Sequence, residues 1–217
     1  MAVLIDSDTK VICQGFTGAQ ATYHMERAIA YGTKVVGGVV PGKGGRGHLG
    51  LPVFDTVAEA REATGATASA VFVPPRNAAD ALIEAIDAGM ELLVCVTERI
   101  PVLDMVRVKH RLEGSGTRLI GPNSQGIMIP GRCKIGVMPA HLERPGKVGI
   151  ASRSASLTSE VIEQISSQRL GQSASIGIGG DPVHGVGFVD CLKLFFDDPD
   201  TACVVLLGEI GGSDEEE

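Results

Sequence analysis

Short apolar runs alternate along this chain with longer stretches in which apolar and polar residues recur at helical spacing. This alternation is typical of strand–helix units. Before residue 121 it predicts strands at 10–14, 34–39, 68–73, 91–96 and 117–120, with helices at 21–31, 57–64, 78–89 and 102–114. Five strands with intervening helices are enough for a complete α/β domain with a parallel sheet.

Residues 121–146 interrupt this pattern, since they carry four Pro and five Gly and no long periodic stretch. The series then restarts, with strands expected at 147–151, 173–178 and 202–207 and helices near 157–168 and 187–196. We therefore expect a first domain at 1–121, a linker at 122–146 and a second α/β domain at 147–217. Three strands are too few to match the first domain, so we expect the second to be partial and to lack its C-terminal part.

Composition narrows the class of protein. Aromatic residues make up only 4% of the chain and Gly numbers 29, which suits a parallel sheet of small aliphatic residues joined by Gly-rich turns. The net charge of -7 argues against nucleic acid as a partner. No apolar run approaches the length of a membrane span, no basic targeting peptide is seen, and no metal site is predicted.

The five cysteines show no CxxC spacing, and Cys13, Cys95 and Cys203 lie in or beside apolar runs. Most are expected to be small buried hydrophobic residues, as in a reducing compartment. We therefore expect a soluble intracellular protein.

The first strand–helix turn carries a candidate phosphate site, Gln14-Gly15-Phe16-Thr17-Gly18-Ala19-Gln20. Two glycines three residues apart allow a tight turn and bring backbone N–H groups to a phosphate at the helix N-terminus. This is not the full GxGxxG pattern, so a Gly-rich turn without a ligand remains an alternative.

The end of the second strand separates two kinds of nucleotide site. A nicotinamide site would place an acidic residue there to bond ribose hydroxyls. This chain has Pro41-Gly42-Lys43-Gly44-Gly45-Arg46-Gly47-His48 instead. Cations on a Gly-rich loop favour CoA or a phosphorylated nucleotide, with Lys43 as the main candidate, whereas Arg46 and His48 could simply be solvated. A nicotinamide oxidoreductase is correspondingly disfavoured.

Three further strand ends carry polar groups. Val96-Thr97-Glu98 follows the fourth strand, where Glu98 could bond a ribose or adenine group or merely cap the next turn. In the second domain, Ser152-Arg153-Ser154-Ala155-Ser156 opens a helix and offers hydroxyls and N–H groups beyond those that capping needs. Gly177-Ile178-Gly179-Gly180-Asp181 is a second such turn, and Glu209 follows the last strand. These turns indicate phosphate chemistry.

With these motifs, the chain resembles the alpha subunits of succinate–CoA ligases (succinyl-CoA synthetases) along all 217 residues. Its most specific stretches are VICQGFTG, AYGTKVVGGVVPGKGG, HLGLPVF, GPNS, PGKVGI, GIGGDP and GEIGG. The resemblance implies a Rossmann-like CoA-binding domain followed by an incomplete flavodoxin-like α/β domain. It further implies CoA contacts at Thr17, Gly18, Ala19, Gln20, Lys43, Val96, Thr97 and Glu98.

The resemblance also implies a reaction. In this family a histidine of the second domain is phosphorylated by ATP or GTP, which binds with Mg on a separate beta subunit of the ATP-grasp type. The phosphoryl group passes to a small carboxylic acid, and CoA then displaces it. The turn of Ser154, Ala155 and Ser156 would hold the phosphate, and Glu209 would orient the histidine. The family belongs to the tricarboxylic acid cycle, in the bacterial cytoplasm or the mitochondrial matrix.

None of the five histidines (24, 48, 110, 141 and 184) matches the family histidine, which lies a few dozen residues past position 217. The 217-residue chain alone is therefore expected to be inactive. The alternative to a ligase subunit is a non-catalytic CoA-binding fragment or module.

Relative to the family pattern, Gln125 replaces a Pro, Ala155 a Gly, Ser159 a Tyr and His184 a Pro. Ser124, Gln125 and Ser159 are the residues expected near the acyl substrate. These changes, beside an unchanged CoA turn, predict an acid other than succinate, such as malate or itaconate, or altered turnover. Drift in a duplicated gene is the alternative.

Overall fold

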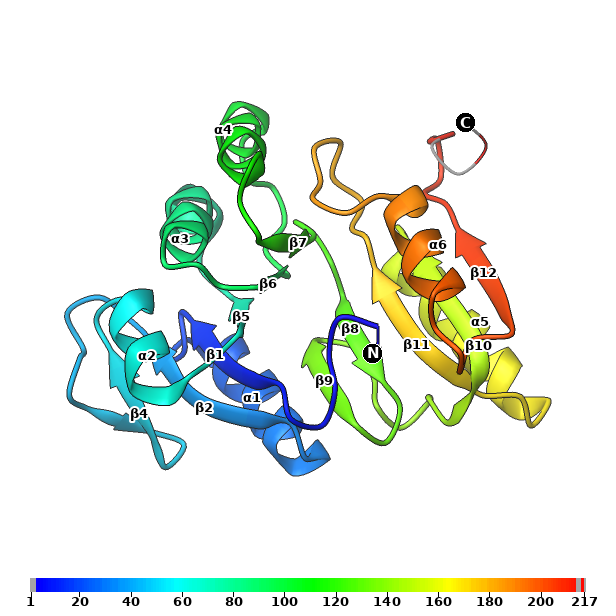
Figure 1. Ribbon diagram of the computed structural model, residues 1–217, viewed down its shortest axis with the longest axis horizontal. Coiled ribbons are helices and arrows are strands. Elements are labelled where there is room, and N and C mark those ends of the chain that lie inside the picture. The colour runs from blue at the N-terminus through cyan, green and yellow to red at the C-terminus, as the bar shows by residue number, and fades with distance from the viewer. Residues whose placement is uncertain (1–2, 214–215, 217) are drawn as a thin grey trace.

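The computed structural model describes residues 3–213 and residue 216, which form two sheets (Figure 1). The first sheet has seven strands in the order β3-β4-β2-β1-β5-β6-β7. All neighbouring pairs are parallel except β3 and β4. Its strands are β1 Lys10–Gln14, β2 Lys34–Val39, β3 Gly47–His48, β4 Leu51–Phe54, β5 Ala68–Val71, β6 Leu92–Cys95 and β7 Arg118–Ile120. The helices are α1 Ala19–Tyr31, α2 Val57–Thr64, α3 Pro75–Asp87 and α4 Val102–Leu112.

Alternate residues of the central strand face opposite sides of this sheet. Val11 and Cys13 pack in one buried cluster with Met25 of α1. Ile12 packs in another, with residues of α2, α3 and α4 such as Leu82. Because side chains in a strand alternate between faces, α1 covers one face and the other three helices cover the opposite one.

The second sheet has five strands in the order β12-β10-β11-β8-β9. Strands β10, β11 and β12 are parallel, whereas β8 and β9 form an antiparallel hairpin and β8 runs antiparallel to β11. These strands are β8 Gly126–Ile129, β9 Cys133–Gly136, β10 Pro145–Ser152, β11 Gln172–Gly177 and β12 Cys203–Leu207, with helices α5 Ala155–Ser167 and α6 Phe188–Phe196. Ile162 of α5 packs on Val148 and Ile150 of β10, whereas Phe195 of α6 belongs to the cluster on the other face.

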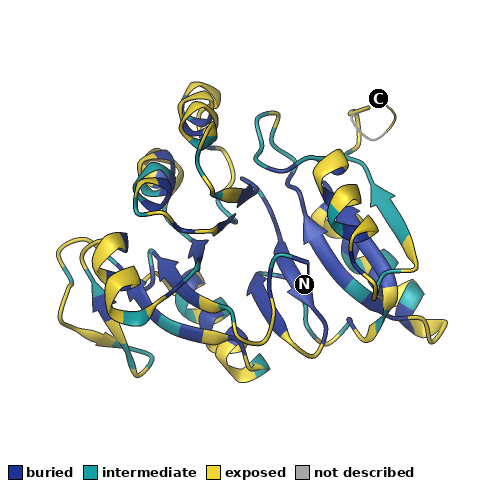
Figure 2. Cartoon of the chain, viewed as in Figure 1, coloured by how far each residue is buried: buried dark blue, intermediate teal, exposed yellow. Residues whose placement is uncertain are grey.

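All the strands proposed from the sequence are present, and the mixed α/β class with parallel sheets is confirmed. The structure adds two hairpins that the sequence analysis did not anticipate, β3–β4 and β8–β9. The second of them lies inside residues 122–146, where we expected only a linker, and it is hydrogen-bonded into the second sheet through β11. Every residue of β8 and β9 is buried, including Lys134 (Figure 2).

One cluster of buried residues runs through both parts of the molecule. It contains Phe16 and Met25 of the first part, Ile127 and Ile135 of the β8–β9 hairpin, and Phe195 of α6. The hairpin therefore joins the α1 face of the first sheet to the second sheet through apolar packing. Within residues 3–213, no helix is long and apolar enough to cross a membrane.

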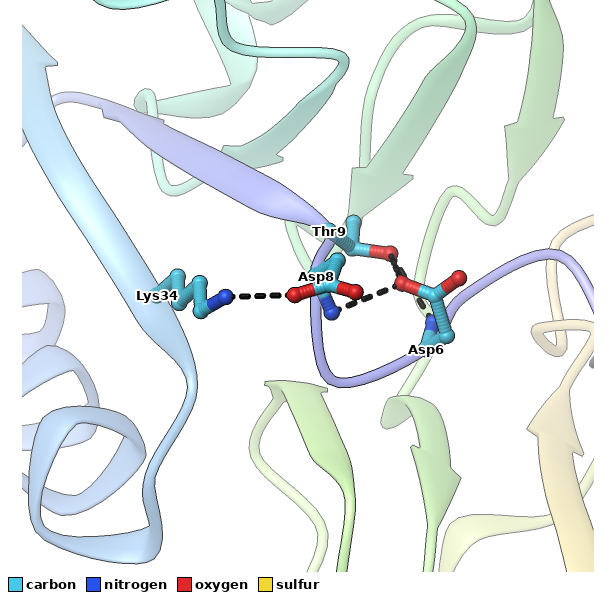
Figure 3. A network of polar contacts seen from close by, with 4 residues as sticks. All are labelled: Asp6, Asp8, Thr9 and Lys34. Carbon is cyan, nitrogen blue, oxygen red and sulfur yellow. Dashed lines mark hydrogen bonds and ion pairs between the residues drawn. The ribbon is translucent and has the colours of Figure 1, made fainter.

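A short polar network fixes the segment that leads into β1 (Figure 3). The Asp6 carboxylate accepts hydrogen bonds from the Asp8 N–H (2.8 Å) and the Thr9 hydroxyl (3.0 Å). Asp8 in turn pairs with Lys34 Nζ at 2.6 Å, at the start of β2. Both side chains of this ion pair are largely exposed, so its contribution to stability is small and it serves mainly to align the two strands.

Candidate functional site

The candidate CoA residues lie at one edge of the first sheet. Strands β2, β1, β5 and β6 are neighbours and parallel, so their carboxyl ends meet at the same edge. From β1 the chain passes through α1 to β2 on one side, and it later enters β5 on the other side. The carboxyl end of the strand where the direction reverses is the usual ligand position in an open α/β sheet.

The turn between β1 and α1 is shaped by its two glycines. Gly15 has φ +80°, and a Cβ there would lie 2.9 Å from the Phe72 carbonyl oxygen after β5. Gly18 is the N-cap of α1, and no side chain caps the helix. Gly18, Ala19 and Gln20 are exposed, so the first N–H groups of α1 remain available to an anion.

The loop after β2 places a cation on this turn. Lys43 Nζ donates a hydrogen bond to Thr17 Oγ1 at 2.8 Å, although 26 residues separate them. Gly44 N donates to Asp55 Oδ1 at 2.9 Å, and a Cβ at Gly44 would lie 2.5 Å from Asp55 Oδ2, so a larger residue there would displace the Asp55 carboxylate. The structure thus brings together Thr17 and Lys43, which the sequence proposed separately.

The third group of candidates, Val96, Thr97 and Glu98, follows β6 at the same edge. The Thr97 hydroxyl donates to the Val73 carbonyl oxygen at 2.7 Å, and the Thr97 carbonyl accepts from Asn123 N at 2.8 Å. These bonds tie the ends of β5 and β6 to the segment that enters the second sheet. The Glu98 side chain is exposed and lies 3.7 Å from Arg99 Nε. Burial raises the pKa of the neighbouring Cys95 thiol to about 12, so that thiol is no nucleophile.

A second cluster lies at the carboxyl edge of the second sheet. Ser152 of β10 is in register with Gly177 of β11 and Leu207 of β12, so the segments that follow these strands meet. Ser154 is the N-cap of α5, yet its side chain makes no capping bond. The Ser152 hydroxyl instead accepts from Ser154 N at 3.1 Å, which leaves the hydroxyl groups of Ser154 and Ser156 outside the cap.

Arg153 organises this cluster, and the sequence analysis did not assign it that role. Only 8% of the residue is exposed. Its guanidinium donates to three consecutive carbonyl oxygens, those of Gly179 (3.3 Å), Gly180 (3.3 Å) and Asp181 (3.2 Å). The signal in the sequence was a cation inside a Ser-rich turn between a strand and a helix.

Glu209 and Asn123 complete the cluster from two other segments. A Cβ at Gly180 would lie 3.2 Å from Glu209 Oε2, so the carboxylate faces the backbone of the Gly179-Gly180-Asp181 loop. Asn123 Nδ2 donates to Asp181 Oδ1 at 3.0 Å. Four segments therefore converge on one place, and they present hydroxyls, the N-terminus of α5 and a carboxylate. In residues 3–213 and 216, no group of three His, Cys, Asp or Glu side chains is arranged to hold a metal ion.

Comparison with known proteins agrees with this two-part arrangement. The family model described as "CoA binding domain" matches residues 6–99, and the model described as "CoA-ligase" matches residues 151–217. "Succinate--CoA ligase [ADP-forming] subunit alpha" of Staphylococcus aureus strain Mu50 is 51% identical over 217 residues, which are 100% of this chain and 72% of that protein. The chain belongs to the family of succinate–CoA ligase alpha subunits. The protein of the same name from Staphylococcus epidermidis is 50% identical over the same span.

Solved structures with less sequence similarity share the fold. An ATP citrate lyase from Methanothrix soehngenii, in complex with citrate and coenzyme A, superposes with a TM-score of 0.84 at 23% identity over 99% of this chain and 38% of that chain. A dinucleotide-forming acetyl-coenzyme A synthetase of Ca. Korarchaeum cryptofilum superposes with a TM-score of 0.76 at 18% identity. The match covers 92% of this chain and 44% of that chain. This chain spans less than half the length of either. The resemblance to a CoA ligase subunit that the sequence motifs carried is confirmed by the closer relatives.

The residues expected near the acyl substrate, Ser124, Gln125 and Ser159, occupy two places. Ser124 and Gln125 are buried beside the end of β11, where the Ser124 hydroxyl bonds the Gly177 carbonyl at 2.5 Å and accepts from Gly126 N at 2.8 Å. A Cβ at Gly177 would lie 2.7 Å from Gln125 Cγ, so only glycine leaves room for Gln125 there. Ser159 lies one turn into α5, with its hydroxyl 3.5 Å from the Ala155 carbonyl.

Proposed function

We propose that this chain is the alpha subunit of an ADP- or GDP-forming acid–CoA ligase, and that it binds CoA at the carboxyl edge of the first sheet. The observation that carries the proposal is the bond between Lys43 and Thr17 at the uncapped N-terminus of α1. A Lys ammonium has three donors, so Lys43 can keep Thr17 and still bond a phosphate oxygen. The other contacts to CoA would come from Thr17, Gly18, Ala19, Gln20, Val96, Thr97 and Glu98.

The second part of the chain would carry phosphoryl transfer. In the proposed reaction, ATP or GTP is bound with Mg on a beta subunit of the ATP-grasp type. The unprotonated ring nitrogen of a histidine attacks the γ-phosphorus atom, and ADP or GDP leaves. The carboxylate of the acid then attacks that phosphorus atom and leaves as an acyl phosphate. The CoA thiolate attacks the acyl carbon, and inorganic phosphate departs.

This chain's own residues have distinct roles in that proposal. The N-terminus of α5, with Ser154, Ala155 and Ser156, would stabilise the negative charge of the phosphate. Glu209 would accept a hydrogen bond from one ring nitrogen of the histidine, which fixes the tautomer with a free second nitrogen.

We place the domain limits at residues 1–121 and 147–217, with residues 122–146 between them. We infer an acid other than succinate, such as malate or itaconate, from the acyl-side residues Ser124, Gln125 and Ser159.

Calorimetric titration with CoA, dephospho-CoA and NAD tests the binding proposal. We expect CoA to bind and NAD not to bind. Lys43→Ala should weaken CoA binding by about 1–3 kcal/mol, because a charge-assisted hydrogen bond is lost. Lys193→Ala, which removes an exposed lysine of α6, is the matched control and should change nothing. Equal affinity for CoA and dephospho-CoA would argue against a contact between Lys43 and the ribose phosphate.

A further inference from the structure

His48 connects the β3–β4 hairpin to the first turn of α1. Its Nε2 lies 2.8 Å from Thr22 Oγ1. The hairpin is also hydrogen-bonded to the loop that carries Lys43. Gly45 N donates to the Val53 carbonyl, and Val53 N donates to the Arg46 carbonyl. His48 is therefore a side-chain tie between the loop that carries Lys43 and the helix whose N-terminus faces the site.

The Thr22 hydroxyl lies between two polar groups. Its oxygen is 2.9 Å from the Gly18 carbonyl, to which the hydroxyl donates. The direction of the His48–Thr22 bond depends on the tautomer of the ring, and a protonated Nε2 donates to Thr22 Oγ1. Thr22 thus links His48 to the N-cap residue Gly18, which is one of the proposed CoA contacts.

The His48 ring also contacts the aromatic ring of Phe16. It forms an edge-to-face contact with Phe16, with ring centroids 5.0 Å apart and an interplanar angle of 88°. Phe16 is fully buried and packs directly on Gly38, where a Cβ would lie 2.1 Å from the ring. Phe16 belongs to the same turn as Thr17, so His48 contacts the phosphate turn at Phe16 and the first turn of α1 at Thr22.

We propose that His48 is a positioning residue of the CoA site: it holds the Lys43 loop against the N-terminus of α1, so that the Lys43 ammonium and the first N–H groups of α1 act on the same ligand. This inference rests on the proposed CoA site. The Lys43 ammonium is offered to the phosphate, whereas the His48–Thr22 bond involves no group offered to the ligand and can persist. Preserving the loop position in this way lowers the ordering cost of binding.

Two conservative variants separate the hydrogen bond from the mere presence of a polar side chain. His48→Gln places an amide N–H at about the reach of Nε2, whereas His48→Asn carries the same amide one methylene short. Thr22→Val removes the acceptor. We would measure Kd for CoA and dephospho-CoA by calorimetry for the wild type, the three single variants and the His48→Asn/Thr22→Val double variant, with thermal melts of each.

We expect His48→Asn and Thr22→Val each to weaken CoA binding by roughly three- to tenfold, the loss of one hydrogen bond. His48→Gln should remain within about twofold of the wild type, and His48→Asn should add little in the Thr22→Val background. The affinity for dephospho-CoA should change less than the affinity for CoA, because dephospho-CoA lacks the ribose phosphate that Lys43 is proposed to bind. A purely structural role would lower all affinities in parallel with the melting temperatures.

Equal losses in His48→Gln and His48→Asn, or additive losses in the double variant, would overturn the role of His48 while leaving the CoA site intact. Normal CoA binding by His48→Asn would do the same. Failure of the wild type to bind CoA would instead overturn the proposed site itself, and the positioning role with it. The wild-type titration therefore distinguishes the two failures.

Discussion

Among single residues, Gln125, which we propose lies near the acyl substrate, has an unusual environment. Only 6% of it is exposed, and its amide nitrogen has no hydrogen-bond partner within the described residues. It lies against Gly177, which is in register with Ser152 at the start of the turn into α5. A buried donor without a partner costs about 1–3 kcal/mol, so a proline at this position would remove an unfavourable group.

Gln125→Pro should therefore shift acid preference without destabilising the fold. In an assembly of a beta subunit with a full-length alpha subunit that carries the family histidine, we expect the variant to raise kcat/KM for succinate relative to malate and itaconate. The change should be roughly tenfold, as for a contact worth about 1.4 kcal/mol. The measurement is acyl-CoA formation from a panel of acids, accompanied by thermal melts. Gln168→Ala, at the end of α5, is the control. An unchanged ranking of acids would remove Gln125 from the determinants of specificity.

At the level of elements, the β8–β9 hairpin is bonded to the end of α1 as well as to the second sheet. Thr33 Oγ1 donates to the Lys134 carbonyl at 2.9 Å and accepts from Lys134 N at 3.0 Å. Tyr31 Oη accepts from Gly131 N at 2.6 Å. The first half of β9 and the turn before it are thus connected to the first part of the molecule by side chain–backbone bonds, and Thr33 is buried.

Thr33→Val should destabilise the protein by about 2 kcal/mol, because it leaves a buried N–H and a buried carbonyl of Lys134 without partners. Thr33→Ser keeps the hydroxyl and should cost much less. Urea unfolding, with the midpoint and slope compared across the three proteins, measures the effect. If valine and serine proved equivalent, the two bonds would contribute nothing to the attachment of the hairpin.

The same hairpins show where sequence patterns are informative and where they are not. Strands such as β1 and β10 were predictable because they are apolar runs between Gly-rich turns and helical stretches. The two-residue strand β3 has no periodicity to read, and β9 contains a buried lysine and a glycine that mask its strand character. Within the site, Lys43 and Thr17 were proposed from their own loops. The contacts of Arg153 and His48 depend on segments that only the folded chain brings together.

Across the whole molecule, a buried ionisable pair lies on the α5 side of the second sheet, close to the first part of the chain. Burial raises the pKa of Glu143 to about 8, against the opposing effect of the Lys134 charge. Burial, with the Arg27 charge of α1, lowers the pKa of Lys134 to about 8. Neither Glu143 oxygen has a hydrogen-bond partner among the described residues. Both groups therefore resist ionisation in the folded state.

This environment predicts how stability depends on pH. Below the ordinary Glu value of 4.5, Glu143 is protonated in both the folded and the unfolded chain. Between 4.5 and about 8 the unfolded chain ionises while the folded one stays protonated, so the Glu143 contribution to stability falls as the pH rises. Lys134 has the opposite effect on stability. Below about pH 8 its buried charge destabilises the folded chain. Between about pH 8 and 10.5 the folded chain loses this proton first, so its stability rises with the pH.

Glu143→Gln removes the carboxyl titration and keeps the shape of the side chain. Its stability should match that of the wild type near pH 5 and exceed it by roughly 1–3 kcal/mol near pH 8, because the wild type has by then lost the Glu143 contribution. Urea unfolding at pH 5, 6.5 and 8 gives the difference directly, and Glu163→Gln on the exposed face of α5 is the matched control. Parallel curves for Glu143→Gln and the wild type would mean that Glu143 is already ionised in the folded protein. The Lys134 charge would then compensate the buried carboxylate, and the hairpin would be held by an ion pair rather than by a neutral acid.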